Sequence, residues 1–313
     1  MAIPLAPGPT RPADIAEPIR LPAAPTVPGG VLLGAVAAGR RPDSRAMALT
    51  ASSVALHGAG MALDDWADRH LDTAERPGRP IPSGRVTHRT TRCLAAGLTL
   101  GSLALTHLAA GRRALLTRAL PFAATVWWYD PGRRSTPRGP ATMALPRALD
   151  VLHGTGAGPM RGALLPAAVI AAHTHAVTRL SRHEGDGRAG TEPYIALATT
   201  TAPSLVAGAA PGPRIRATPA ARTPTPTLRA LTAATVVSDS ATTPYAATAA
   251  PVRLVAVRQP GAARVRAAVG AGIHAFLPLQ GALLSRAGRP VLGGLLAAEL
   301  PLARRSARKV SPT

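Results

Sequence analysis

The chain of 313 residues is poor in cysteine, aromatic residues and acidic residues, and each shortage narrows what it can be. Cys93 is the only cysteine, so the sequence can build neither an intrachain disulfide framework nor a CxxC-type zinc site. Aromatic residues make up 3% of the chain, so a soluble core of this size would consist mainly of Ala, Leu and Val. Acidic residues number 15 against 36 Lys and Arg, which gives a net charge of +21.

An excess of positive charge has three ordinary interpretations: nucleic-acid binding, contact with a membrane surface, or the cytoplasmic loops of a membrane protein. A nucleic-acid interface would need arginines on one face, interleaved with aromatic platforms. Here the arginines are spread over many short loops, and the chain has only three Trp, three Tyr and two Phe. We therefore expect no nucleic-acid partner.

Short apolar runs recur along the chain and are separated by arginine-bearing stretches. They lie at 22–39, 46–64, 93–111, 114–129, 141–157, 162–178, 193–210, 229–250, 266–285 and 289–303. These runs predict an all-α, polytopic transmembrane bundle. However, several are shorter than the ~20 residues of a spanning helix, and the mean hydropathy of +0.13 is low. Hydropathy alone leaves a soluble, Ala-rich helical bundle open.

The distribution of arginines favours one orientation in the cell membrane, although incompletely. With the N-terminus inside, the segments 65–92, 130–140, 179–192 and 251–265 all face the cytoplasm. The first of these carries six arginines: Arg69, Arg76, Arg79, Arg85, Arg89 and Arg92. The opposite face carries Arg40, Arg41, Arg112, Arg113, Arg214 and Arg216.

The remaining segments are irregular. The N-terminus lacks the charged segment and apolar run of a signal peptide, and we expect residues 1–21 to form a disordered, Pro-rich lead-in. Residues 22–303 would then form one membrane domain, with 304–313 as a basic tail. Within that domain, the Pro- and Thr-rich stretch 211–228 predicts a connector between two groups of helices.

A cluster of carboxylates follows the second apolar run. On a helix that continues from 46, Asp65, Asp68 and Asp72 stand at i, i+3 and i+7 and share one face, which Asp64 borders. Carboxylates at this spacing repel each other, and a cation would neutralise them. Oxygen ligands favour Mg²⁺ or Ca²⁺. The alternative is an acidic helix end solvated at the surface.

The loop that follows the cluster reads ERPGRPIPSG and covers 75–84. Its three prolines stiffen the backbone, so the loop loses less entropy when it closes over a ligand. Arg76 and Arg79 offer fork-shaped donors that match phosphate oxygens. A carboxylate–metal site beside such a loop is suited to a diphosphate.

These residues resemble the UbiA superfamily of intramembrane prenyltransferases, whose first motif is NDxxDxxxD followed by a D/ERPxRPLPSG loop. Asp65, Asp68 and Asp72 match the aspartates of that motif, and Asp64 replaces its Asn. The resemblance implies about nine transmembrane helices around a central cavity, with Mg²⁺ and a prenyl diphosphate bound near the cytoplasmic end. It also implies transfer of the prenyl group to an acceptor that the sequence does not identify, an aromatic ring, a glycerol lipid, a sugar or a cyclitol, with membrane lipid as a further partner.

Two downstream segments resemble an actinobacterial, EboC-like branch of the family. In 127–154 this resemblance assigns Asp130 to the active site and Arg134 to the diphosphate. In 173–187 it places Arg182 where it could bind the diphosphate if this loop caps the cavity. The closing RKVSPT also resembles this branch.

The second aspartate motif of the family, DxxxD, is replaced here by Glu184 and Asp186, which are two residues apart and flanked by glycines. Side chains at this spacing cannot share a helical face, so a second metal site would have to form through a loop. We therefore keep a second hypothesis beside the Mg²⁺-dependent enzyme. In it, the chain is a catalytically silent homologue that acts as a membrane scaffold or lipid binder.

Overall fold

The computed structural model describes residues 26–128, 138–185, 190–209, 244–259 and 261–302, together with Thr136, Arg304 and Arg305. The predicted lead-in 1–21, the connector 211–228 and most of the basic tail lie outside these residues. The described parts of the chain contain helices and no strand, which confirms the all-α prediction.

The first two helices are set by local signals in the sequence. α2 (Pro28–Ala37) begins with a proline, whose fixed φ suits a first helical turn. α3 (Ser44–Ala67) is capped by Asp43, whose carboxylate accepts a hydrogen bond from the Ala46 backbone N–H at 2.9 Å. α3 covers the predicted run 46–64 and continues into the carboxylate motif.

The next helices form an antiparallel hairpin. α5 (His88–Ala114) is followed without a gap by the π-helical turn η2 (Leu115–Ala119) and by α6 (Leu120–Trp128). At Gly111, however, φ is 78° and ψ is 178°, which reverses the chain. The Trp127 indole N–H therefore donates to Thr99 Oγ1 at 3.0 Å, across 28 residues of sequence. This confirms two separate helices where the sequence has runs at 93–111 and 114–129.

The middle of the bundle is packed through small residues. α7 (Gly139–Gly154) lies against α2, and α8 (Arg161–Ser181) lies against α7. A Cβ on Gly34 of α2 would lie 1.8 Å from the Val151 carbonyl oxygen of α7. A Cβ on Gly154 would likewise lie 2.1 Å from the Val31 carbonyl oxygen. The two backbones approach this closely only because both positions lack a side chain.

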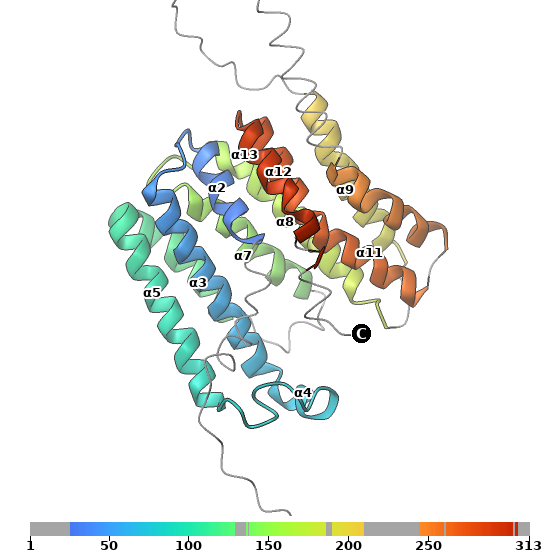
Figure 1. Ribbon diagram of the computed structural model, residues 1–313, viewed down its shortest axis with the longest axis horizontal. Helices are drawn as coiled ribbons and strands as arrows, with labels where there is room; N and C mark the ends of the chain where they lie inside the picture. The colour runs from blue at the N-terminus through green and yellow to red at the C-terminus, as the bar shows by residue number, and fades with distance from the viewer. Residues whose placement is uncertain are drawn as a thin grey trace, which may run out of the picture.

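The second half of the bundle contains the helices α9 (Glu192–Ala209), 244–258, α11 (Ala262–His274), α12 (Phe276–Arg286) and α13 (Pro290–Ala298). In Figure 1, α9 and α11 lie on one side, α3 and α5 lie on the other, and α2, α7, α8 and α12 lie between them.

The helix 244–258 differs from the prediction, which ended this apolar run at 250. Arg253 falls in the segment 251–265, which was expected to face the cytoplasm, yet its side chain is fully buried in the bundle. Its Nη1 donates to the Ala196 carbonyl oxygen and to Thr200 Oγ1, both on α9. The helix can therefore continue past 250 because another helix accepts hydrogen bonds from the guanidinium, a contact that hydropathy does not register.

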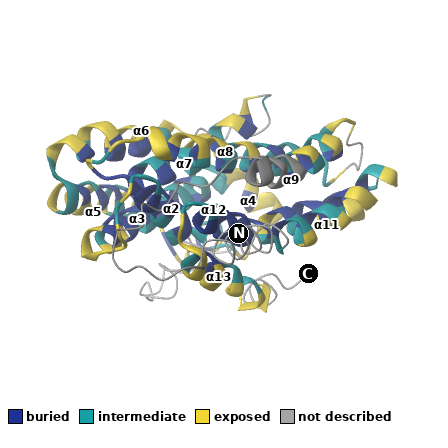
Figure 2. Cartoon of the chain, turned by 90° about the horizontal axis from the view of Figure 1, so that it is seen from above, coloured by how far each residue is buried: buried dark blue, intermediate teal, exposed yellow. Residues whose placement is uncertain are grey.

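The surface of the bundle is apolar. Large side chains on the outer faces of the helices are exposed, among them Leu100, Leu108 and Val291. Figure 2 shows exposed faces along α5, α6 and α11, while α2 and α12 between them are mostly buried. Among the residues that the structure describes, three helical stretches are long and apolar enough to cross a membrane: Ser44–Ala67, His88–Trp128 and Ala262–Arg286.

The second of these stretches has 41 residues. As one straight helix it would measure about 60 Å, twice the hydrocarbon thickness of a bilayer. The reversal at Gly111 turns it into two crossings. The chain is thus a polytopic transmembrane helical bundle, and the count of about nine helices stays a prediction.

Candidate active site

The aspartate motif lies where α3 ends and α4 (Arg69–Glu75) begins. Asp68 stands at the junction, with φ −76° and ψ −2°. The helical hydrogen bonds continue through it, because the Asp68 N–H donates to the Asp64 carbonyl at 2.9 Å and the Asp72 N–H donates to the Asp68 carbonyl at 2.8 Å. The helical course of the backbone therefore continues across the junction, as the i, i+3, i+7 pattern of aspartates requires.

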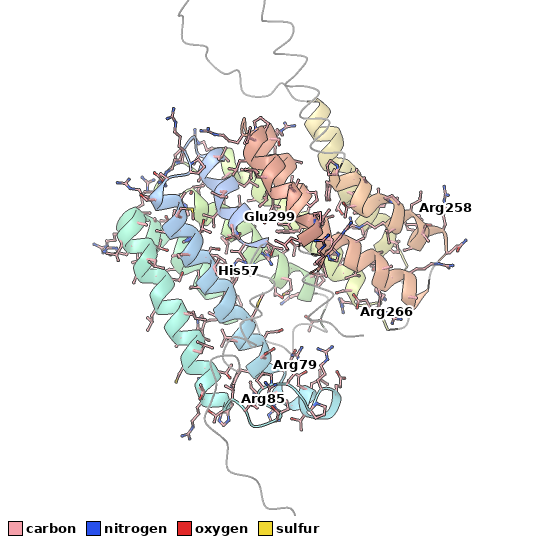
Figure 3. The ribbon with its side chains drawn as sticks, in the orientation of Figure 1. His57, Arg79, Arg85, Arg258, Arg266 and Glu299 are labelled. Atoms are coloured by element: carbon pink, nitrogen blue, oxygen red, sulfur yellow. The ribbon has the colours of Figure 1, made fainter. Side chains whose placement is uncertain are left out.

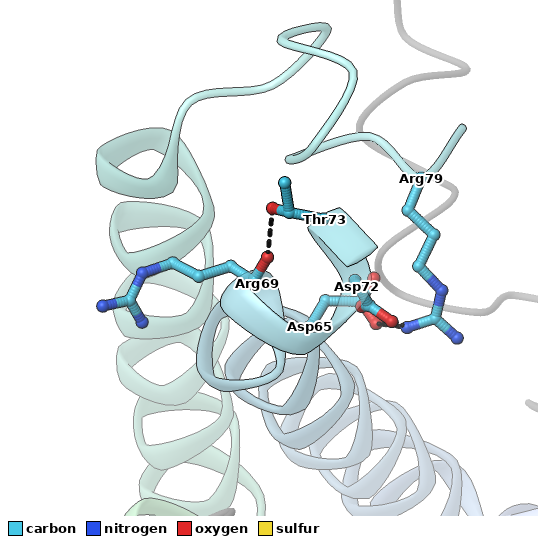
Figure 4. Close-up of polar contacts among 5 residues, drawn as sticks. All are labelled: Asp65, Arg69, Asp72, Thr73 and Arg79. Atoms are coloured by element: carbon cyan, nitrogen blue, oxygen red, sulfur yellow. Dashed lines mark hydrogen bonds and ion pairs between the residues drawn. The ribbon is translucent and has the colours of Figure 1, made fainter. Parts of the chain in front are cut away.

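Two of the carboxylates share one cation from the same chain. Arg79 Nη1 donates to Asp65 Oδ1 at 3.1 Å and to Asp72 Oδ2 at 2.9 Å (Figure 4). Because both oxygens contact the same nitrogen, they can be at most about 6 Å apart. Asp65 is 6% exposed and Asp72 is 4% exposed, so water screens the two charges poorly.

The loop that carries Arg79 is folded against the helix ends. Its backbone closes on itself, since the Ser83 N–H donates to the Arg79 carbonyl at 2.9 Å and the Val86 N–H donates to the Pro80 carbonyl at 3.0 Å. Arg85 Nη2 donates to the Gly78 carbonyl at 2.8 Å. These bonds fix the direction from which Arg79 approaches the carboxylates, and in Figure 3 Arg79 and Arg85 both lie at this end of the bundle.

The other residues of the first motif are more accessible. Asp64 and Asp68 are half-buried, and the Arg76 side chain is exposed. The guanidinium groups of Arg69 and Arg92 lie over the Trp66 ring, at 4.7 and 5.2 Å from its centroid, and hold that side chain beside the motif. Arg76 is therefore free of the cluster, while Arg79 is part of it.

The site fits a magnesium ion only in part. All its donors are carboxylate oxygens, which are the ligands that Mg²⁺ prefers, and two of them are buried within reach of one shared cation. However, the residues that the structure describes contain no group of three His, Cys, Asp or Glu side chains gathered closely enough to hold a metal ion. These residues would hold Mg²⁺ only together with other oxygen ligands.

The predicted residues of the second motif are not gathered at this site in the described parts of the chain. Arg182 is exposed just after α8, and Glu184 is half-buried in the next turn, where its carbonyl accepts from Arg266 Nη1 at 3.2 Å. Burial raises the pKa of the Glu184 carboxyl, which disfavours the charged form that a metal ligand needs. Asp130, Arg134 and Asp186 lie outside the described residues.

Buried polar side chains join α3 to α7, and the sequence reasoning did not predict the contribution of Ser52, Ser53, His57 and His153. Ser53 Oγ donates to the Asp150 carboxylate and also contacts His57 Nδ1 at 3.4 Å. The adjacent Ser52 Oγ contacts His153 Nε2 at 3.2 Å, about one turn along α7 from Asp150. Figure 3 shows His57 part-way along the bundle from Arg79. The signal was present in the sequence as hydroxyl and imidazole groups inside apolar runs.

Three atoms in this region are buried with no hydrogen-bond partner among the described residues: His57 Nε2, His153 Nδ1 and Arg147 Nη1. Buried polar atoms are normally satisfied, so each of the three invites a polar partner. The Arg147 guanidinium lies over the Phe276 ring, 5.1 Å from its centroid. Polar atoms with unused hydrogen-bonding capacity thus lie among the apolar side chains of the bundle.

Comparison with known proteins decides the family. The sequence profile of the UbiA prenyltransferase family matches residues 24–210, more than half of the chain. The chain belongs to the UbiA prenyltransferase family. The matched residues include the aspartate motif and the Arg79 loop.

Curated relatives match over short stretches. The digeranylgeranylglyceryl phosphate synthase of Methanopyrus kandleri is 40% identical over 68 residues, 22% of this chain and 25% of that protein. That of Ignicoccus hospitalis is 43% identical over 75 residues, 24% of each chain. The bacteriochlorophyll synthase 33 kDa chain of Cereibacter sphaeroides is 44% identical over 48 residues, 15% of this chain and 16% of that protein. The matches span a quarter or less of these relatives.

Two solved structures show the same fold. One, from work on digeranylgeranylglyceryl phosphate synthase in membranes, has a TM-score of 0.58 at 15% identity and covers 90% of this chain and 98% of its own. The apo structure of a UbiA homologue from Aeropyrum pernix K1 has a TM-score of 0.57 at 15% identity and covers 87% and 98%. Since the identity is low, these likenesses concern the fold alone. The EboC-like branch stays a prediction.

Proposed function

We propose that this protein is a Mg²⁺-dependent prenyltransferase, which moves a prenyl group from a prenyl diphosphate to an acceptor inside the membrane. The observation that carries the proposal is the pair of buried carboxylates, Asp65 and Asp72, bridged by Arg79 at one end of an apolar bundle. A buried double negative charge beside a guanidinium is an arrangement for cations and phosphates rather than for packing.

The roles of the residues follow from their chemistry. Asp65, Asp68 and Asp72 would hold Mg²⁺, with Asp64 at the border of the set. When bound, this ion would neutralise the negative charge of the departing diphosphate. Arg76 projects from the first residue after α4 and donates to phosphate oxygens. Arg79 donates to the same oxygens once it leaves the carboxylates.

The interior of the bundle supplies the remaining conditions. The apolar side chains of the core exclude water, which would otherwise react with the allylic cation of the prenyl group. The buried network of Ser53, His57 and Asp150 gives the acceptor hydrogen-bonding groups within the bundle. This supports an acceptor with a polar, proton-bearing group.

The same reasoning gives an orientation. The segment 65–92, which runs from the end of α3 through α4 into the first turns of α5, carries six arginines, and we place this end on the cytoplasmic face of the cell membrane. A prenyl diphosphate made in the cytoplasm would then reach the carboxylates directly.

One observation favours the second hypothesis, that of a catalytically silent family member. Among the described residues the carboxylates do not form a ready metal site, and Arg79 already neutralises two of them. A chain that retains the motif for structure alone would look the same without ligands.

Binding of tritiated geranylgeranyl diphosphate to the protein in mild detergent, with Mg²⁺ or with EDTA, separates the two hypotheses. We expect binding that requires Mg²⁺ and that weakens at least 10-fold in Asp72→Asn. Glu299→Gln is the control, because it removes one negative charge from the exposed end of α13. Folded protein that binds no prenyl diphosphate of any tested length in Mg²⁺ would support the silent homologue.

A further inference from the structure

A basic cavity lies at the end of the bundle opposite the carboxylates. Its volume is about 430 Å³, and its lining includes Arg40, Arg45, His107, Leu108 and Gly158. Arg45 and Asp65 are both on α3, 20 residues apart. That spacing corresponds to about 30 Å along the helix, the hydrocarbon thickness of a bilayer. The cavity is therefore separate from the proposed active site and lies near the other membrane surface.

Three chain reversals build this cavity. They are the connection between α2 and α3, the turn at Gly111 in the hairpin, and the connection between α7 and α8. Gly156, in the last of these, has φ +56°, and a Cβ there would lie 2.6 Å from Arg40 Nη1. The Arg40 side chain is thus packed along this turn, so its position is fixed by the fold.

A buried arginine donates hydrogen bonds to the connection between α7 and α8. Arg118 in η2 is 5% exposed, and its Nε donates to Thr155 Oγ1 at 3.0 Å. Its Nη2 donates to the Gly158 carbonyl at 3.3 Å. Since Gly158 lines the cavity, these bonds hold the wall in place and add positive charge beside it.

The charge of the cavity is one-sided. None of its lining residues is a carboxylate. Asp43, just outside it, has its Oδ1 3.8 Å from Arg40 Nη2, and that carboxylate also caps α3. Arg112 and Arg113 directly follow the lining residue Gly111. Like charges so close together repel, and an anion bound among them would relieve the repulsion.

The apolar part of the lining indicates where the anion comes from. Leu108 lines the cavity and is 82% exposed, on a helix whose outer face is apolar. An acyl chain lying along α5 would cover this leucine, while a phosphate would meet the guanidinium groups. A freely soluble anion gains nothing from Leu108.

From this arrangement we propose that the cavity binds the phosphate-bearing headgroup of an anionic membrane lipid, through Arg40 and Arg45, with an acyl chain along Leu108. The site is a lipid site on the face away from the carboxylates, and it does not depend on the proposed transfer reaction. A volume of about 430 Å³ accommodates a phosphate with its glycerol and part of a chain.

The test measures thermal unfolding of the detergent-solubilised protein by tryptophan fluorescence, titrated with dioleoyl phosphatidylglycerol, dioleoyl phosphatidylcholine or inorganic phosphate. We expect phosphatidylglycerol to raise the unfolding temperature at concentrations at least 10-fold lower than phosphatidylcholine. Inorganic phosphate at the same phosphate concentration should have no such effect.

Paired variants decide whether this cavity is responsible. Arg40→Gln with Arg45→Gln should weaken the phosphatidylglycerol response at least 10-fold, and Arg45→Gln alone, at an exposed side chain, should weaken it with no effect on folding. Arg41→Gln with Arg161→Gln removes the same charge from exposed residues outside the lining and should leave the response within two-fold.

Three results would overturn the proposal. They are equal responses to the two lipids, a full response to inorganic phosphate alone, and unchanged phosphatidylglycerol affinity in Arg45→Gln and in the double variant.

Discussion

Arg79→Gln tests whether the guanidinium is the cation that makes the Asp65–Asp72 pair tolerable. The change keeps a hydrogen-bonding amide near both carboxylates but removes the positive charge. The two buried carboxylates would then lose the cation that they share. We therefore expect the variant to fold less stably than the wild type when no divalent metal is present.

The magnitude follows from the distances. A unit charge pair at about 4 Å is worth about 4 kcal/mol at an effective dielectric constant of 20, and breaking a buried pair typically costs 3–5 kcal/mol. The Arg79 side chain is 21% exposed, so solvent screens part of this. We expect a loss of about 2 kcal/mol, or a fall in unfolding temperature of about 4–8 °C.

The assay is thermal unfolding in detergent and EDTA, followed through the tryptophans, of which Trp66 lies beside the motif. Adding Mg²⁺ should recover part of the loss, because a divalent ion can bind between the freed carboxylates. Arg89→Ala, at an exposed side chain in the first turn of α5, is the control and should unfold like the wild type. If Arg79→Gln unfolds at the wild-type temperature in EDTA, the bridge does not carry this energy and the reasoning fails.

Three further predictions concern packing, a buried hydroxyl and orientation. Gly34→Ala should destabilise the bundle by more than about 3 kcal/mol, since its Cβ would lie 1.8 Å from the Val151 carbonyl oxygen. Gly97→Ala, whose Cβ would have nothing within 4 Å, should instead stabilise α5 by about 0.5–1 kcal/mol. Equal unfolding temperatures of the two variants would contradict this. Tyr245→Phe should lower the free energy of unfolding by about 1–2 kcal/mol, because the hydroxyl contacts His173 Nδ1 at 3.0 Å and donates to the Thr199 carbonyl at 3.1 Å. Tyr194→Phe, at a side chain 58% exposed, should change nothing, and a similar loss in both variants would refute the assignment. Arg89→Cys in a Cys93→Ser background should react with a membrane-impermeant maleimide only in inside-out vesicles; labelling of intact cells would reverse the proposed orientation.

The parts of the structure that the sequence predicted are those set by local pattern. The apolar runs 22–39 and 46–64 mark the helices α2 and α3, and the motif spacing places Asp65 and Asp72 on one side of the chain. Each of these signals lies within a few residues of its effect. The hairpin at Gly111 belongs here too, since two apolar runs flank it.

The parts that the sequence did not predict depend on contacts between distant segments. Arg253 is inside a helix because Ala196 and Thr200 accept its hydrogen bonds, and nothing within its own stretch of sequence signals this. Arg79 was expected to bind phosphate, and its bridge between two carboxylates became visible only when the loop was placed. The roles of Asp65, Asp68, Asp72, Arg76 and Arg182 as ligands stay predictions, as do those of Glu184 and the residues outside the described parts.

The close approach of α2 and α7 has a consequence for how the protein is made. α2 emerges from the ribosome first among the described helices, yet Gly34 finds its partner surface on Val151, more than a hundred residues later. Until α7 has entered the bilayer, the glycine face of α2 has no helix to receive it. The first of the described helices therefore completes its packing only after α7 is in the membrane, so the order of synthesis and the order of assembly differ.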